Sequence, residues 1–221
     1  IFGSVITCAL ALAIATPFSL ATAIFMTEIS PELGKRFVQP AVEIFVGIPS
    51  VVYGWIGLTI LVPLIKNIFN LRFGFSVLAA GIVLAVMIFP TITSLAADAL
   101  RSIPKSYRAA SYGLGATRWQ TIAKVVVPAA VTGLMTAVIL GLARAFGEAL
   151  AVAMVIGKMR AFPSSLLAPT NNLTAAIAAD MGGAMEGSEY NIALWTMALL
   201  LFIISLVCIF AIHFLTAKGG K

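Results

Sequence analysis

Long apolar runs alternate with short polar segments along the whole chain, and this pattern is the first guide to the fold. A helix needs about 20 apolar residues to cross a bilayer, whereas a transmembrane strand would show about 10 residues of alternating character. Five runs reach the length of a transmembrane helix: residues 2–25, 38–65, 75–97, 125–156 and 191–215. The pattern therefore predicts an all-α integral membrane protein, a helical bundle of five transmembrane helices forming a single domain over residues 1–221.

The second run contains a segment that favours a break in its helix. Gly47-Ile48-Pro49-Ser50 lies inside it, and proline removes a backbone donor from a helix. Freed backbone groups at membrane depth are tolerated only against protein or water. The break is therefore either a kink for packing or a gate or ligand contact, which makes Ser50 a candidate pathway residue. Glu43 lies just inside the same run, after Pro40, and is either a first-turn carboxylate favoured by the helix dipole or another pathway candidate.

A polar segment of 27 residues, 98–124, separates the third and fourth runs. Pro104 suits the first turn of a helix, and the glycines that follow Tyr112 can end that helix. Thr117 and Gln120 fit a capping box that starts a second helix. The segment is predicted to form helix, glycine turn and helix at the membrane surface. The alternative is a basic, solvated connection held by anionic lipid.

Composition agrees with a membrane protein and excludes several functions. Of the 221 residues, 61% are hydrophobic and 10% charged, against about 25% charged in a soluble domain. Cys8 and Cys208 lie in apolar runs and His213 is the single histidine, so we expect no metal site and no disulfide. The sequence has no G-x-x-x-x-G-K-[ST] loop, so ATP hydrolysis by that route is excluded. We expect no cofactor in this chain and no nucleic-acid partner.

The net charge of +6 is interpreted as a topology signal at the surface of membrane lipid. If residues 98–124 are cytoplasmic, nine cationic residues face the cytoplasm: Lys35, Arg36, Arg101, Lys105, Arg108, Arg118, Lys124, Lys218 and Lys221. Four face outside: Lys66, Arg72, Lys158 and Arg160. This bias predicts a cytoplasmic C-terminus. The sequence opens inside an apolar run without a methionine, so we also expect an upstream span, which would make six.

One cation, Arg144, lies within the fourth run, 16 residues after Pro128 and 13 before Gly157. If that run is one helix, Arg144 lies about 24 Å and about 20 Å from its ends, deep in the bilayer. There it needs a partner or a wet cavity. Glu148, four residues on, would share its helical face. The two residues form either a buried ion pair or a pathway site in which Arg144 meets a tetrahedral oxyanion.

The polar segment resembles the cytoplasmic loop of ABC importer permeases, which has the pattern E-A-A-x-x-x-G-x(9)-I-x-L-P. The residues on that spacing are Ala109, Ala110, Ser111, Gly115 and Pro128. Ala109 stands where the family has glutamate, and Ser111 where it has the second alanine. The resemblance implies that residues 98–128 hold a coupling helix that docks into an ATP-binding subunit. It also implies that ATP with Mg²⁺ is bound by that subunit and that this chain is not an enzyme.

Two further stretches are similar to phosphate-specific permeases of the C type. Residues 43–54 follow E-x-x-x-G-I-P-S-V-x-Y-G, and residues 140–152 read LGLARAFGEALAV. The resemblance covers essentially the whole chain and implies a type I importer transmembrane domain that forms half of a phosphate pathway in the cell membrane. The implied partners are a second permease in a heterodimer, two ATP-binding subunits and an extracytoplasmic phosphate-binding protein. The resemblance also supports Arg144 and Glu148 as pathway residues.

Two alternatives stay open. Sulfate, molybdate and tungstate permeases form the nearest alternative; sulfate and molybdate permeases share the R-A-x-G-E core but usually continue F-G-A, whereas residues 149–151 here read ALA. An ion-coupled secondary carrier or channel would need no ATPase, and the coupling-type loop argues against it. Co-purification with an ATPase would distinguish an ABC permease from an ion-coupled carrier or channel.

Overall fold

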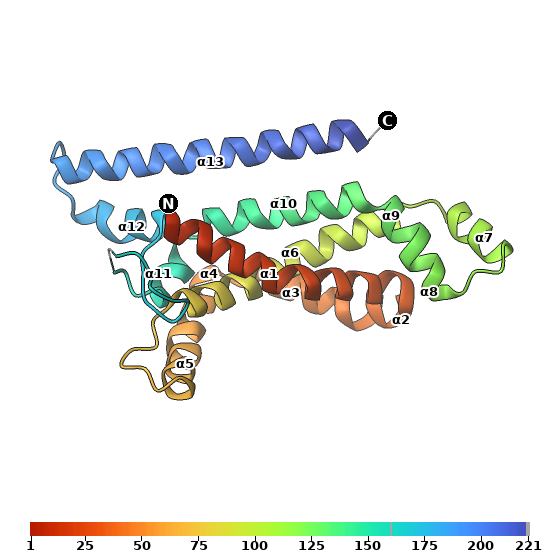
Figure 1. Ribbon diagram of the computed structural model, residues 1–221, viewed down its shortest axis with the longest axis horizontal. Coiled ribbons are helices and arrows are strands. Elements are labelled where there is room, and N and C mark those ends of the chain that lie inside the picture. The colour runs from red at the N-terminus through yellow and green to blue at the C-terminus, as the bar shows by residue number, and fades with distance from the viewer. Residues whose placement is uncertain (160, 220–221) are drawn as a thin grey trace.

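The computed structural model describes residues 1–159 and 161–219. This part of the chain forms an elongated helical bundle without strands (Figure 1). Four helices in it are long and apolar enough to cross a membrane, or five if one bent pair is a single span. The predicted all-α membrane fold is confirmed. Arg160 and Lys221, two of the predicted loop cations, lie outside the described residues.

Two helices that run in the same direction form the centre of the bundle, α1 (Phe2–Ile24) and α6 (Val77–Arg101). The buried face of α1 consists mainly of small residues three or four positions apart: Gly3, Ser4, Thr7, Cys8, Ala11, Ala15, Ser19 and Ala23. Small side chains let two backbones approach closely, which is how helices associate in lipid. The Ser19 hydroxyl also donates to the carbonyl oxygen of Phe89, 3.1 Å away. These two helices therefore form the rigid support for the rest.

The second predicted span, residues 38–65, is divided into two helical stretches at the predicted break. After α1 the chain continues as π-helix η1 (Phe25–Ile29), α2 (Pro31–Leu33) and π-helix η2 (Gly34–Val38) into α3 (Gln39–Gly47). A separate apolar helix runs over Ser50–Ile68, through α4 (Ser50–Ile56), π-helix η3 (Gly57–Leu61) and α5 (Val62–Ile68). Glu43 lies in the middle of α3 with helical turns before it, so its first-turn interpretation is also wrong.

The predicted interruption at Gly47-Ile48-Pro49-Ser50 is confirmed. Ile48 and Pro49 are extended, with ψ angles of 128° and 140°. Pro49 has no N–H to offer the carbonyl of Phe45, four residues earlier. The hydroxyl of Tyr53 donates to that carbonyl instead, at 2.7 Å. A buried tyrosine therefore satisfies the backbone group that the break sets free.

The fourth predicted span, residues 125–156, is divided at both ends. The helical stretch Arg118–Ala129 comprises α8 (Arg118–Thr121), π-helix η4 (Ile122–Val126) and α9 (Val127–Ala129), and it is bent by 67° from α10 (Val131–Gly147). At the other end Glu148 is extended, with ψ 122°, and α11 (Leu150–Val155) follows. The prediction of one continuous helix is wrong.

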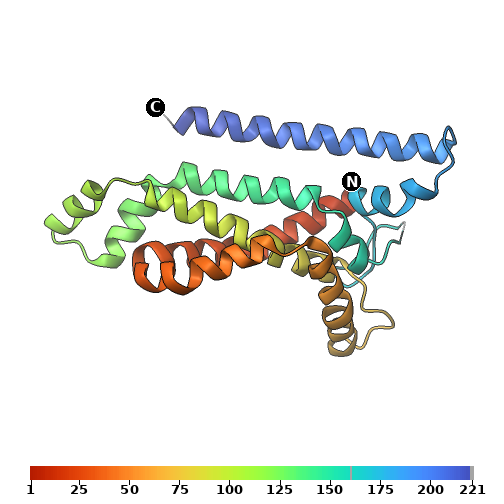
Figure 2. The same ribbon diagram turned by 180° about the vertical axis from the view of Figure 1, so that it is seen from behind.

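Tertiary packing explains why the chain leaves the axis of α10. Helix α11 lies against α4, where Gly54 permits close approach: a Cβ on Gly54 would lie 2.8 Å from the Cα of Ala151. Residues 149–155 therefore pack across α4. Helices α12 (Leu173–Asp180) and α13 (Glu189–Gly219), separated by the short 3₁₀ helix Met181–Gly183, complete the fold, with α13 lying beside α10 in both views (Figures 1 and 2). The predicted apolar run 191–215 lies within α13.

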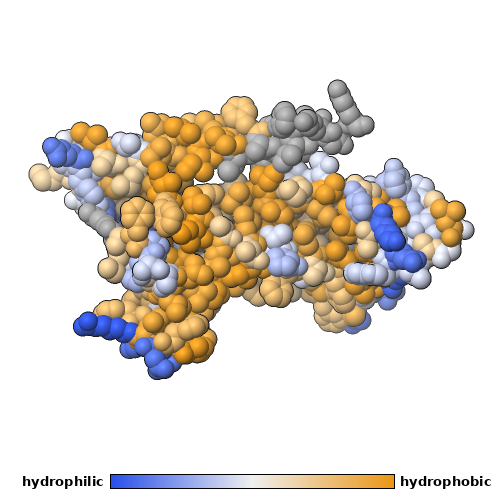
Figure 3. Space-filling model, in the orientation of Figure 1, coloured by the Kyte–Doolittle hydropathy of each residue, from blue (hydrophilic) through white to orange (hydrophobic). Residues whose placement is uncertain are grey.

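The bundle has two polar ends with an apolar surface between them (Figure 3). One end carries α2 and η2, together with α7 (Lys105–Gly113) and α8. These four elements carry five of the nine predicted cytoplasmic cations: Lys35, Arg36, Lys105, Arg108 and Arg118. Arg101 lies at the same end, where it borders a cavity with Lys35. Lys66, predicted to face outside, lies on α5 at the other end. The cations predicted to be cytoplasmic and Lys66, predicted to face outside, thus lie at opposite ends of the bundle.

Candidate functional site

Arg144 lies in the last turn of α10 and is half-buried. Its Nη1 donates to Oγ1 of Thr91 on α6, 2.6 Å away. Thr91 follows Pro90 within the buried helix α6. A guanidinium has five N–H donors, so this contact leaves others for a ligand. The arginine is therefore aimed by a neighbouring helix, not by its own helix.

Glu148 lies just beyond the end of α10, not on the same helical face as Arg144. Its Oε1 accepts from the backbone N–H of Ala151 at 3.1 Å, which satisfies a free donor in the first turn of α11. Its carbonyl oxygen accepts from the Thr174 hydroxyl of α12 at 2.7 Å. The same-face expectation is wrong because the helix ends at Gly147. Within the described residues Arg144 and Glu148 make no ion pair.

The helix break between α3 and α4 belongs to the surroundings of Arg144. Tyr53, which spans the break, lies within electrostatic range of the Arg144 guanidinium. Ser50 opens α4 and is half-buried. Arg144, Glu148 and the break are therefore grouped around α10, α11 and α4, while the hydroxyl of Thr91 reaches the group from α6. Sequence reasoning missed Thr91; a hydroxyl directly after a proline in an apolar run was the available signal.

Glu43 belongs to a different network. Its Oε1 accepts from Nε2 of Gln39 at 2.9 Å, and Oε1 of Gln39 accepts from Nη2 of Arg101 at 3.1 Å. Arg101 also pairs with Asp98 at 3.5 Å. Gln39, Glu43 and Arg101 border an open cavity of about 540 Å³, together with Lys35 and Pro40. The structure thus links Glu43 to the end of α6, not to Arg144.

The polar segment has the predicted helix–turn–helix form. Helix α7 ends where Gly115 takes a positive φ of 79°. The N–H of Gly115 donates to the carbonyl of Tyr112 at 2.9 Å and that of Ala116 to Ser111 at 3.2 Å, which is a Schellman motif. The capping box of Thr117 and Gln120 is present at the start of α8. Both predicted signals are confirmed.

Large apolar side chains project from this segment. Leu114 is 90% exposed and Trp119 is 69% exposed, and Tyr107 and Tyr112 are also exposed. The small residues Ala109 and Ala110 are exposed, whereas Ser111 is buried with its Oγ 2.9 Å from Oγ1 of Thr121. A contiguous exposed apolar patch typically marks a protein contact. The segment therefore has the character of a docking surface, and Pro128 lies in α9, next to the bend into α10.

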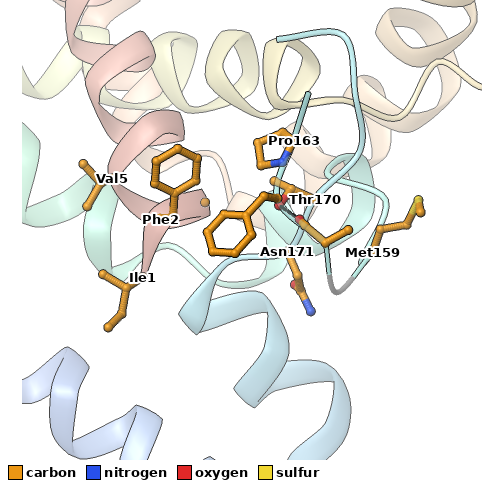
Figure 4. A pocket seen from close by; sticks show the side chains of 10 residues that line it. Ile1, Phe2, Val5, Met159, Pro163, Thr170 and Asn171 are labelled. Carbon is orange, nitrogen blue, oxygen red and sulfur yellow. Dashed lines mark hydrogen bonds between the residues drawn. The ribbon is translucent and has the colours of Figure 1, made fainter. Parts of the chain in front are cut away.

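One cavity is not a candidate for an oxyanion. It measures about 570 Å³ and lies between the start of α1 and the loop after α11 (Figure 4). Phe2 and Phe162 meet edge to face in it, with ring centroids 5.4 Å apart. Thr170 uses its hydroxyl on the carbonyl of Ala161, at 3.0 Å. The described side chains that line this cavity are uncharged, so they provide little to bind an anion.

An apolar bundle with broken helices around one arginine and a surface docking segment defines a transport permease. The fold agrees: a solved structure of the MetNI methionine ABC transporter in an inward-facing conformation matches with a TM-score of 0.70. It is 22% identical, and the match covers 99% of this chain and 92% of that chain. At that identity the match shows the fold alone, which is that of a type I ABC importer permease.

The family follows from sequence comparison. Residues 15–218 match the family described as binding-protein-dependent transport system inner membrane component, and the chain belongs to that family. A probable ABC transporter permease, YqgH of Bacillus subtilis, is 55% identical over 99% of this chain and 71% of that protein. The phosphate transport system permease protein PstC of Haemophilus influenzae is 39% identical, over 93% of this chain and 70% of that protein. A probable PstC of Methanocaldococcus jannaschii is 33% identical, over 94% and 70%.

The predicted resemblance to phosphate-type ABC permeases is therefore confirmed, and the chain is a permease subunit of an ABC importer. Such a subunit is a multi-pass inner-membrane component without an ATPase of its own. Importers of this kind work with ATPase subunits, a binding protein and a second permease. The chain spans about 70% of the length of these relatives.

Proposed function

We propose that this permease carries inorganic phosphate through the membrane as one half of a translocation pathway. The observation that carries the proposal is the half-buried Arg144, aimed by Thr91 and surrounded by broken helices. Guanidinium matches the oxygens of a tetrahedral oxyanion, and breaks in helices at membrane depth are tolerated where they meet protein or line a water-filled path. Relatives named PstC at 33–39% identity support phosphate as the oxyanion.

Glu148 supplies the means to distinguish phosphate from sulfate or molybdate. A carboxylate only accepts hydrogen bonds, and near neutral pH phosphate carries a proton that it can donate. An oxyanion without a proton meets a like charge there, which disfavours it. The N–H of Ala151 uses only Oε1 of Glu148, so the second carboxylate oxygen can accept from the substrate.

Coupling is assigned to residues 98–128. The exposed Leu114 and Trp119, beside Ala109 and Ala110, form the surface that docks on an ATP-binding subunit, which binds ATP with Mg²⁺. In this arrangement the segment and the C-terminus are cytoplasmic. The further partners are a second, different permease, a second ATP-binding subunit and an extracytoplasmic phosphate-binding protein, with membrane lipid around the apolar surface. Glu43 and Ser50 are assigned to the walls of the pathway.

The test is phosphate uptake by the complete complex in proteoliposomes. Uptake should require ATP and should persist in the presence of excess sulfate or molybdate. Uptake of sulfate or molybdate in preference to phosphate would identify the chain as a sulfate or molybdate permease instead. Phosphate uptake that continues without ATPase subunits would identify an ion-coupled carrier.

A further inference from the structure

A partly buried ion pair joins the end of the first helix to the docking segment. Glu28 lies in η1, directly after α1, and Arg108 lies in α7, 80 residues later. Both carboxylate oxygens are used: Oε2 accepts from Nε of Arg108 at 3.1 Å, and Oε1 accepts from Nη2. The side chains are only 9% and 19% exposed. Such a two-point contact fixes orientation as well as distance.

Arg108 and a second arginine, Arg118, bind the free carbonyls of two helix ends. Arg108 donates to the carbonyls of Ile103 at 2.8 Å and Leu100 at 3.1 Å, at the end of α6. Arg118, on α8, donates to the carbonyl of Ile29 at 2.6 Å and to that of Glu28. The last carbonyls of a helix lack partners within it. The cluster Glu28–Arg108–Arg118 therefore joins the ends of α1 and α6 to both helices of the docking segment.

We infer that Glu28 is a positioning residue for energy coupling: it clamps the docking segment to the central helices so that movement of the segment reaches the pathway. This inference rests on the proposed docking of an ATPase. We call the cluster Glu28–Arg108–Arg118 the clamp. Without its contacts, α7 and α8 would be connected to the bundle mainly through the chain on either side of them. With it, a displacement of α7 is delivered to α1, which packs along α6, the helix that carries Thr91.

The ion pair between Glu28 and Arg108 does not depend on pH in the physiological range. The hydrogen bond with Glu28 raises the pKa of Arg108 above its ordinary value, so the guanidinium stays charged throughout the physiological range. Its contribution is therefore mechanical, through the distance and angle between helices. Removing the charge of Glu28 leaves Arg108 without its carboxylate and weakens the ion pair that joins η1 directly to α7.

The experiment uses the complete complex with its ATPase subunits in vesicles and compares Glu28→Gln with Glu32→Gln. Glu32 is an exposed carboxylate one turn further on and serves as the matched control. We expect Glu28→Gln to assemble and hydrolyse ATP, with phosphate transported per ATP lowered about tenfold, the usual scale for a hydrogen bond to a charged group. Hydrogen exchange of backbone amides in residues 105–121 should become faster in Glu28→Gln and stay unchanged in Glu32→Gln.

Equal coupling and equal exchange in the two variants would overturn the inference. If Glu28→Gln does not assemble, Arg108→Lys replaces it, because lysine keeps the charge but loses the two-point contact; normal coupling in Arg108→Lys would overturn the clamp, and lowered coupling would support it. A wild-type complex that transports no phosphate would refute the proposed substrate, whereas the exchange comparison would still decide the clamp.

Discussion

The guanidinium of Arg144 on α10 donates to the hydroxyl of Thr91 on α6, across 2.6 Å and 53 residues of sequence. This contact holds the single intramembrane arginine away from its sequence neighbour Glu148, which caps α11 instead. The site is thus built from side chains on separate helices. The proposed transport depends on this arrangement.

Arg144→Gln is expected to abolish phosphate uptake, by at least about a hundredfold, because it removes the charged donors for the oxyanion. Thr91→Val keeps the shape but removes the hydrogen-bond acceptor, so we expect a partial loss of about tenfold. Uptake by reconstituted complexes, with assembly checked by co-purification, measures both. Near-normal flux in Arg144→Gln would reduce the arginine to a structural role.

Glu148→Gln separates the charge of the carboxylate from its capping role, since an amide oxygen can still accept from the N–H of Ala151. We expect lower phosphate transport and weaker exclusion of sulfate. The binding protein selects phosphate first, so the measurement needs a variant complex that works without it, or direct binding to the permease. Glu148→Ala is the contrasting variant, because it should also destabilise the start of α11 by about 1 kcal/mol. Unchanged sulfate response in Glu148→Gln would remove the discriminating role.

Gly115→Val tests the turn of the docking segment. At a φ of 79° a β-branched residue is strained by roughly 1–2 kcal/mol, so the Schellman motif should distort. We expect weaker ATPase assembly or coupling with normal membrane insertion. Gly113→Val is the matched control, because Gly113 also has open space around it but lies in α7 without a positive φ. Equal coupling in the two variants would contradict the docking role.

The topology is tested by cysteine labelling with an impermeant reagent, in a background in which Cys8 and Cys208 are replaced. A cysteine at Lys158 should react from outside and one at Lys105 should not, since the two exposed positions lie on opposite sides in the proposed orientation. The reverse pattern would place the docking segment outside, where no ATP-binding subunit could reach it.

Local chemistry made much of this fold predictable from sequence. Pro49 lacks a backbone donor and follows Gly47 closely, and this pair predicts the break found at residues 48–49, whereas Pro90 alone does not end α6. Gly115 and the pair Thr117 and Gln120 act within four or five residues, so the turn between α7 and α8 could be predicted with its caps. The apolar runs determined the membrane class for the same reason: transfer into lipid depends on composition over about 20 residues.

Tertiary structure decided where α10 ends and what each charge contacts. The sequence alone predicted one helix through residue 156, but close packing of α11 on α4 at Gly54 turns the chain after Gly147. On one continuous helix, the spacing of four residues would place Glu148 beside Arg144. In the structure Arg144 donates to Thr91 instead. Glu28 and Arg108 likewise meet across 80 residues. Such pairings depend on how helices pack, and packing energy is summed over many distant contacts that no local window of sequence contains.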